Sequence, residues 1–132
     1  MLMRHAGIAS AAAVLLALGG CGVDDTAVDK AASAFGAALG AGDLVQACEL
    51  LAPATRAMVE YQQSRPCPQA MQQGNLAPGA VLQVEVWGGA AQARTSSDTL
   101  FLTRTAQGWR VAAAGCVALV DDAPYACKVS GP

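Results

Sequence analysis

Histidine is almost absent from this chain, which contains only one, His5, within its first few residues. Imidazole is the side chain best suited to proton transfer near neutral pH, and it is the commonest metal ligand. Since His5 lies in a segment that we expect to be removed, the mature protein would have no imidazole. We therefore expect no catalysis or metal binding through histidine, and we predict no cofactor.

Positive charge is scarce as well. The whole chain has 8 Lys plus Arg against 10 Asp plus Glu. Loss of Arg4 with the N-terminal segment would leave 7 basic against 10 acidic side chains, and 7 − 10 gives a net charge of −3. Nucleic acids and anionic lipid headgroups both require clustered positive charge. We therefore expect no nucleic acid and no anionic headgroup as an electrostatic partner.

The sequence also lacks an apolar run long enough to span a membrane. Crossing the hydrocarbon core takes roughly 20 apolar residues. The N-terminal apolar stretch, residues 6–18, is shorter than that and is followed by two glycines. The longest later run, residues 111–120, contains a glycine and a cysteine, and it is typical of a strand followed by a loop.

What the N-terminus does contain is the layout of a secretory signal: a basic start at Arg4 and His5, the apolar stretch and the two glycines. Leu18-Gly19-Gly20-Cys21 resembles the lipobox of bacterial lipoproteins, in which an aliphatic residue and two small ones precede the cysteine that receives the lipid. The resemblance implies that residues 1–20 are a signal peptide and that Cys21 is lipidated. The alternative is ordinary cleavage near Gly20, with Cys21 incidental.

The two acyl chains of a diacylglyceryl group hold a protein stably at a membrane, whereas a single chain binds only marginally. We expect residues 21–26 to form a short tether, so that the domain would sit close to the membrane surface. Residues 27–132 are the length of one compact domain.

Four cysteines remain after Cys21: Cys48, Cys67, Cys116 and Cys127. An even number in an exported domain indicates two disulfides, and four cysteines allow three connectivities. One pair flanks a predicted helical hairpin and the other flanks a loop near the C-terminus. We therefore expect Cys48 to pair with Cys67 and Cys116 with Cys127. Zinc binding is the alternative, although the chain has no CxxC pair.

The first part of the domain shows helical periodicity. Residues 26–29 resemble a capping box and predict a helix that ends near residues 40–42. Asp43 is suited to cap a second helix over residues 44–51. Pro53 is suited to the first position of a third helix, which runs to about Tyr61 and is followed by one more helical turn up to Gln73.

Beyond Gly79 the period becomes alternating. Leu82, Val84 and Val86 are predicted to share one face of a half-buried strand. Further strands are predicted over residues 91–95, 99–105, 109–115 and 125–129, with Trp109, Val111 and Ala113 on one face of the fourth. Helices followed by an antiparallel meander define the α+β class.

Three segments stand out together: residues 43–55 (DLVQACELLAPAT), 98–116 (DTLFLTRTAQGWRVAAAGC) and 124–127 (PYAC). They resemble a group of actinobacterial lipoproteins whose exported domain is similar to the NTF2-like, or cone-shaped α+β, fold. The resemblance implies a curved antiparallel sheet wrapped around the first helix, with room for a pocket between them. It also agrees with the expected cysteine pairs. It implies no shared reaction, and fold alone does not define function.

Cone-fold enzymes place a carboxylate, often beside a tyrosine or histidine, in an apolar pocket. The candidates here are Asp98, Glu85, Tyr61 and Tyr125. Simpler interpretations exist for three of them. Asp98 suits a turn, Glu85 alternates with apolar residues and would face solvent, and Tyr125 would pack on the neighbouring disulfide. We therefore assign no catalytic residue.

Three other groups of side chains have both a functional and a structural interpretation. The two tryptophans, Trp87 and Trp109, could line a ligand cavity, but packing is favoured. The serines, Ser33, Ser64, Ser96 and Ser97, lack a histidine partner and a nucleophile-elbow pattern. The arginines Arg94, Arg104 and Arg110 could form a small basic patch on adjacent strands, but the solvated face of a sheet is favoured.

The sequence thus predicts a lipid-anchored extracytoplasmic domain that is not an enzyme. It would bind a protein partner or an apolar small molecule at the outer face of the membrane. One alternative is a cone-fold enzyme of the isomerase, cyclase or dehydratase type that acts on a small lipophilic substrate. Another is a structural or accessory subunit whose own side chains fill the pocket.

Overall fold

The computed structural model of the protein describes residues 21–121 and 124–132. The expected signal peptide, residues 1–20, lies outside this part of the chain. The described helices come first: α1 (Cys21–Gly40), α2 (Leu44–Leu50), α3 (Pro53–Gln63) and α4 (Cys67–Gly74). The strands follow: β1 (Val81–Trp87), β2 (Ala90–Thr95), β3 (Thr99–Thr105), β4 (Gly108–Ala118), β5 (Tyr125–Ala126) and β6 (Val129–Ser130). The predicted α+β class is confirmed.

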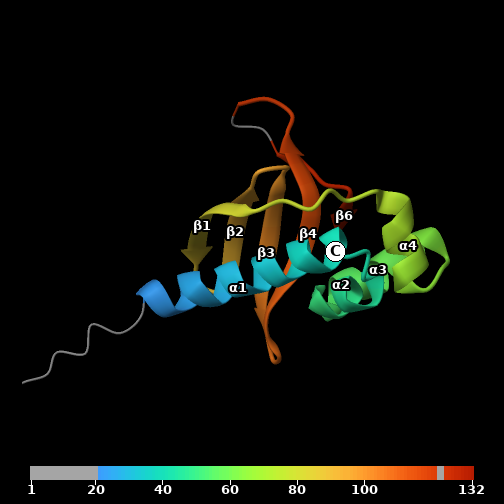
Figure 1. The fold of residues 1–132 in the computed structure, drawn as a ribbon, viewed down its shortest axis with the longest axis horizontal. Coiled ribbons are helices and arrows are strands. Elements are labelled where there is room, and N and C mark those ends of the chain that lie inside the picture. Colours follow the sequence, from blue (N-terminus) through green and yellow to red (C-terminus); the bar gives the residue numbers. More distant parts are fainter. Residues whose placement is uncertain (1–20, 122–123) are drawn as a thin grey trace, which may run out of the picture.

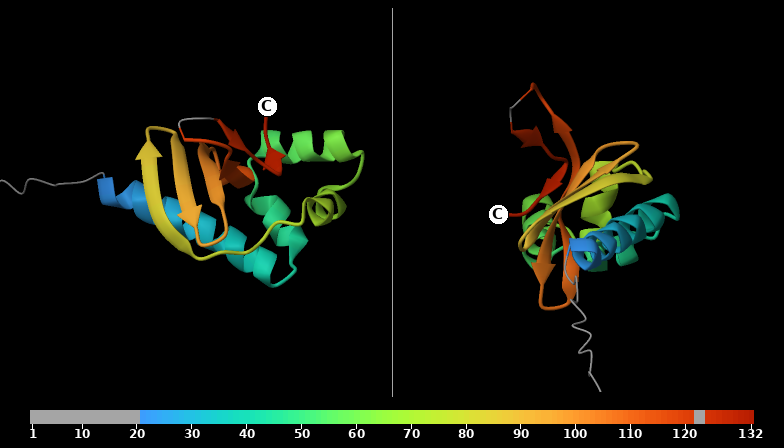
Figure 2. Two further views of the ribbon diagram at one scale, coloured as in Figure 1. Left: turned by 90° about the horizontal axis from the view of Figure 1, so that it is seen from above. Right: turned by 90° about the vertical axis from the view of Figure 1, so that its left-hand side faces the viewer.

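The strands form one antiparallel sheet in the order β1-β2-β3-β4-β5, and β6 also pairs with β4. Figure 1 shows α1 lying across one face of this sheet, while α2, α3 and α4 gather beyond β4. The sheet is strongly twisted, and α1 stays on one side of it (Figure 2). Strand β1 therefore forms one edge of the sheet, and it lies beside the N-terminal half of α1.

The core lies between α1 and the sheet. Val28, Ala32 and Phe35 recur at helical spacing on α1 and are at most 1% exposed. They belong to the same buried cluster as Leu102 of β3 and Val111 of β4. This apolar face of α1 determines how the helix lies on the sheet.

The first helix begins at Cys21, six residues before Ala27, where the capping box predicts its first residue. Residues 21–26, expected to be a tether, belong to α1. The Thr26 hydroxyl donates to the Gly22 carbonyl oxygen at 2.8 Å, one helical turn back. Threonine therefore makes a bond inside the helix here and does not cap its N-terminus.

Two details of the strands also differ from the sequence pattern. Leu82 was expected to share the buried face with Val84, but it is 62% exposed, because the register between β1 and β2 shifts between Val81 and Gln83. A similar shift between β3 and β4 buries Ala114 more fully than Ala113. The strand predicted over residues 125–129 is two short strands, β5 and β6.

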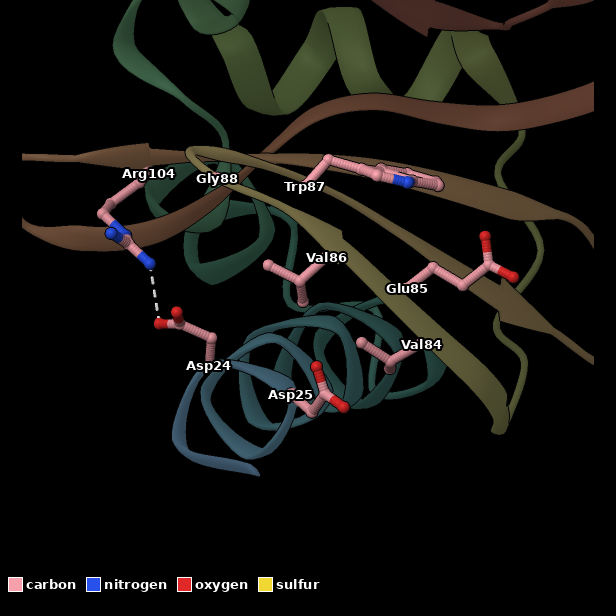
Figure 3. A pocket seen from close by; sticks show the side chains of 8 residues that line it. All are labelled: Asp24, Asp25, Val84, Glu85, Val86, Trp87, Gly88 and Arg104. Carbon is pink, nitrogen blue, oxygen red and sulfur yellow. Dashed lines mark hydrogen bonds and ion pairs between the residues drawn. The ribbon is translucent and has the colours of Figure 1, made fainter. Parts of the chain in front are cut away.

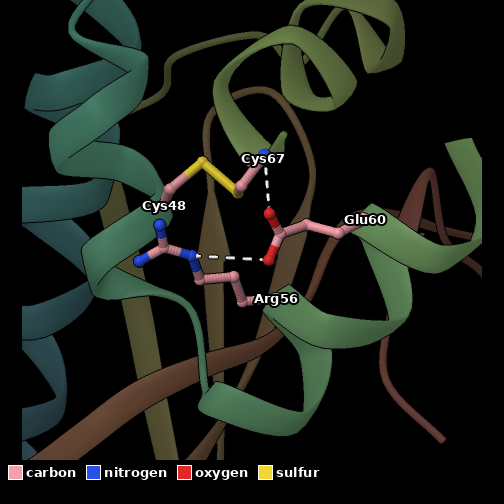
Figure 4. A network of polar contacts seen from close by, with 4 residues as sticks. All are labelled: Cys48, Arg56, Glu60 and Cys67. Atoms are coloured by element: carbon pink, nitrogen blue, oxygen red, sulfur yellow. Dashed lines mark hydrogen bonds and ion pairs between the residues drawn. A yellow bond between two sulfur atoms is a disulfide. The ribbon is translucent and has the colours of Figure 1, made fainter. Parts of the chain in front are cut away.

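The structure pairs Cys48 with Cys67 and Cys116 with Cys127, as the sequence predicted. The first bridge joins α2 to the start of α4 (Figure 4). Glu60 of α3 accepts a hydrogen bond from the Cys67 backbone N–H at 3.2 Å, and its other oxygen lies 3.8 Å from Arg56 Nε. Two disulfides are typical of proteins exported to an oxidising compartment.

None of the described helices combines the length and the apolar character needed to cross a bilayer. Within the described residues, no cluster of histidine, cysteine or acidic side chains is placed to hold a metal ion.

Candidate functional site

A groove runs between the N-terminal half of α1 and the edge strand β1. One part of it has a volume of about 560 Å³ and a neighbouring part about 480 Å³, and the two parts share Asp25 and Val84. We call this feature the edge groove. The residues that line it are Asp24, Asp25, Thr26, Asp29, Lys30, Val81, Leu82, Gln83, Val84, Glu85, Val86, Trp87, Gly88 and Arg104.

Strand β1 presents two different surfaces to the edge groove. Figure 3 shows Val84 and Val86 pointing toward α1, and Glu85 and Trp87 pointing away from it. The valines are half-buried and form an apolar floor. Trp87 is 54% exposed and Leu82 is 62% exposed, so large apolar side chains meet solvent along the same strand. Exposed apolar surface of this kind marks interaction sites when it is contiguous.

The α1 wall of the edge groove is acidic. Asp25 and Asp29 are exposed one turn apart on the helix, and Asp24 precedes them. The only strand residue that neutralises this wall among the described contacts is Arg104, whose Nη2 lies 2.7 Å from Asp24 Oδ1. Arg104 also lies over the Trp109 ring, with its guanidinium carbon 4.9 Å from the ring centroid. Lys30 lines the same wall and offsets one of the two remaining carboxylates, Asp25 and Asp29, so the wall keeps a net negative charge.

The outer edge of β1 has no backbone partner within the described residues. Strand β2 occupies its other side, with Trp87 opposite Ala90 across the Gly88-Gly89 turn. In antiparallel pairs, residues alternate between exchanging hydrogen bonds with the neighbouring strand and directing their N–H and C=O groups outward. With a two-residue turn, Trp87 and Glu85 bond to β2, so Val84 and Val86 direct their backbone groups to the free edge.

Two of the predicted catalytic candidates, Glu85 and Tyr125, line one small pocket of about 120 Å³ together with Gln83, Gln92 and Arg94, whereas Asp98 and Tyr61 lie outside it. Asp98 lies in the turn before β3, where its backbone N–H donates to Thr95 Oγ1 at 3.1 Å. Tyr61 is 82% exposed on α3. Tyr125 packs edge-on against Phe101, with ring centroids 5.1 Å apart, and its hydroxyl accepts a hydrogen bond from Gln92. Of the four candidates, only Glu85 lines the edge groove.

The surroundings of Asp98 shift the pKa of its carboxyl group. Desolvation by partial burial raises the pKa of its carboxyl group. The hydrogen bond from Thr95 and the charge of Lys128 lower this pKa, but by less. The hydrogen bonds around Asp98 are those of a tight turn, so we assign it a structural role.

The two tryptophans lie in different environments. Trp109 is 6% exposed and belongs to the core, as the packing interpretation predicted. Trp87 lines the edge groove and is half exposed.

The three arginines do not form one patch. Arg94 stands opposite Thr99 at the start of β3, whereas Arg104 and Arg110 lie toward the other end of that strand. Arg104 is paired with α1 through Asp24.

The serines have local roles. Ser96 Oγ accepts a hydrogen bond from the Ala80 N–H, and Ser97 Oγ donates to the Pro78 carbonyl oxygen at 2.8 Å. Ser33 donates to Asp29, and Ser64 ends α3 in the left-handed region.

The edge groove does not follow from the sequence pattern. That pattern places the aspartates of α1 in a tether and a cap, and it places Leu82 on the buried face. The signal that could have revealed the groove is the pair of large apolar residues at the two ends of β1, Leu82 and Trp87, which alternation cannot place on one face.

Comparison with protein-family models, with curated proteins and with solved structures gave no match for this chain.

Proposed function

We propose that this protein is a lipid-anchored extracytoplasmic domain of the NTF2-like class, which binds a protein partner at the outer face of the membrane and catalyses no reaction. Its anchor is Cys21, lipidated after removal of residues 1–20. The observation that carries the binding role is the apolar surface along the free edge of β1, where Leu82 is 62% and Trp87 54% exposed.

The close packing of the domain's interior supports binding at the surface of the protein and not in an internal cavity. A cone-fold enzyme would hold a lipophilic substrate between the first helix and the sheet. Here Phe35, Leu102 and Trp109 occupy that space and are 0%, 2% and 6% exposed. Because close-packed side chains use this interior for stability, the edge groove is the better candidate for binding.

The NTF2-like assignment is supported by the order and placement of the elements. The helices precede an antiparallel meander, and α1 lies across one face of a twisted sheet (Figures 1 and 2). The lipid anchor is supported by the lipobox-like segment that ends at Cys21 and by two disulfides, which belong to an oxidising compartment.

Photocrosslinking in living cells tests the binding role. A photoreactive amino acid would replace Leu82 in one variant and Val45 in another, since Val45 is 61% exposed on α2, away from the edge groove. We expect a protein adduct of defined mass at position 82 and none at position 45. The Cys21→Ala variant should be released from the membrane fraction.

Equal adducts at both positions would contradict the proposed site. A small apolar molecule that co-purifies with the protein and crosslinks at position 82 would instead support the ligand-binding alternative. Membrane retention of the Cys21→Ala variant would contradict the lipid anchor.

A further inference from the structure

We infer that the edge groove binds an extended segment of a partner protein, which adds to the sheet as a strand beside β1 and carries basic side chains on the face toward α1. The inference rests on the binding role proposed above and specifies its site and its partner. Three observations carry it: the free edge, the acidic wall and the exposed Trp87 on the opposite face.

The free edge supplies the backbone interaction. Val84 and Val86 direct their N–H and C=O groups outward, and within the described residues nothing pairs with them. An extended peptide pairs with such an edge through main-chain hydrogen bonds, and neighbouring side chains supply specificity. Strand β1 has seven residues. At about 3.4 Å per residue, a partner segment of roughly five to seven residues matches it.

The two faces of the edge define the side chains of the partner. Successive side chains of an added strand point to opposite faces of the sheet. Those on one face would lie beside Asp25, Asp29 and Lys30 of α1, whose net negative charge suits lysine or arginine. Those on the other face would lie beside Glu85 and Trp87, which point away from α1 (Figure 3), and the Trp87 ring suits apolar side chains. Charge complementarity of this kind favours the right partner and steers its approach.

A second copy of this chain fits the edge less well. Antiparallel pairing of β1 with β1 would continue one sheet across both copies and place both α1 helices on the same face. The Asp25 and Asp29 carboxylates of each copy would then face those of the other. Each copy would also bring Lys30 to this contact, but its two aspartates outnumber that one lysine, so the net negative charges repel and favour a basic partner over a second copy.

The test uses the purified full-length protein and a blocked seven-residue peptide that alternates lysine with valine. We expect binding by calorimetry, together with slower hydrogen exchange of the Val84 and Val86 amides. A peptide that alternates glutamate with valine should bind at least about tenfold more weakly. Of two lysine–valine peptides N-methylated on alternate residues, one should keep its affinity and the other should lose it, because only one edge of the peptide faces β1.

A double charge reversal provides the matched protein control. Asp25→Lys with Asp29→Lys should weaken binding of the lysine–valine peptide about tenfold. Glu49→Lys with Asp121→Lys changes the net charge equally at exposed positions away from the edge groove. That variant should change the affinity by no more than about twofold, because salt screens distant charges.

Three results would overturn the inference: equal binding of both peptide charge types, equal binding of both N-methylated peptides, or a stable dimer of the protein with protected Val84 and Val86 amides. None of them would by itself contradict the proposed binding role. If Leu82 still crosslinks to a partner in cells, that role stands and only the mode of binding is wrong.

Discussion

At the scale of a single residue, Asp98 lies in a turn where its surroundings shift the pKa of its carboxyl group. Its backbone N–H donates to Thr95 Oγ1, and the same hydroxyl lies 3.3 Å from the Asp98 carboxylate. Partial burial raises the pKa of this carboxyl group above its ordinary value of 3.8, against the smaller effects of Thr95 and Lys128. The folded protein therefore holds this proton more tightly than the unfolded chain does.

This raised pKa predicts the sign of a pH effect. Since the folded state binds more protons, the contribution of Asp98 to stability is present below pH 3.8 and falls as the pH rises through its folded pKa. Asp98→Asn keeps an oxygen for the Thr95 hydroxyl and removes the charge. Urea unfolding at about pH 7 should give a higher free energy of unfolding for this variant than for the wild type, and the gain should vanish near pH 3.

The exposed Asp121 serves as the control for this experiment. Asp121→Asn should leave the free energy of unfolding unchanged at both pH values. A lower stability of Asp98→Asn than of the wild type at neutral pH would contradict this account of Asp98.

Residue-level prediction from the sequence failed where the backbone departs from regular pairing. Alternation placed Leu82 inside, but the register shift between Val81 and Gln83 turns Leu82 outward. An alternating pattern predicts the face of each side chain only if the strand is regular. A register shift of one residue reverses the faces of the residues that precede it. Residue type does not indicate the position of this shift, so the sequence does not predict the exposure of Leu82.

At the scale of elements, the conformation of β4 depends on Gly115. This glycine has φ of +64°, and a Cβ atom added to it would lie 2.8 Å from Leu76 Cδ2. Gly115→Ala combines a backbone conformation that is unfavourable for alanine with a steric overlap. We expect it to lower the free energy of unfolding by about 1–3 kcal/mol in urea titrations.

Gly89 provides a matched control for the glycine in β4. A Cβ atom at Gly89 would have nothing within 4 Å, and Gly89 lacks a positive φ. Gly89→Ala should therefore change stability by less than about 0.5 kcal/mol. Equal losses for both variants would show that the crowding at Gly115 is unimportant.

The Cys48–Cys67 bridge joins α2 to α4 across a separation of 19 residues. Closing a loop of this size restricts the unfolded chain and stabilises the fold by about 3 kcal/mol. Replacing both cysteines with alanine should lower the free energy of unfolding by about that amount. The Cys21→Ala variant, which leaves both bridges intact, should keep the wild-type value; an unchanged stability of the double variant would contradict a structural role for the bridge.

At the scale of the whole molecule, the sequence predicted the class of fold well, because its periodicities are strong and local. The capping residue Asp43 accepts from the Gln46 N–H, and Pro53 begins α3, as expected. The bounds of the strands over residues 81–118 also follow the turn signals. The edge groove could not be predicted in this way, since it depends on how α1 lies relative to the free edge of β1, a long-range arrangement.

Two disulfides cross-link the domain, and one edge of its sheet has no pairing strand within the described residues. Its two disulfides stabilise the helical end and the C-terminal end of the sheet, while the β1 edge beside α1 is left free among the described residues. Exposed strand edges invite association with other chains. Anchoring at Cys21, the first residue of α1, would hold this edge close to the membrane, where a partner in or on the membrane could reach it.

We propose that the mature protein is lipid-anchored at Cys21 and carries both disulfides in its native state. The most direct test is the intact mass of the protein extracted from membranes, measured with and without reductant after alkylation. We predict a chain that begins at a diacylglyceryl-modified Cys21 and has no thiol free to alkylate in the native state. An unmodified N-terminus at another residue, or four thiols free to alkylate, would contradict the account.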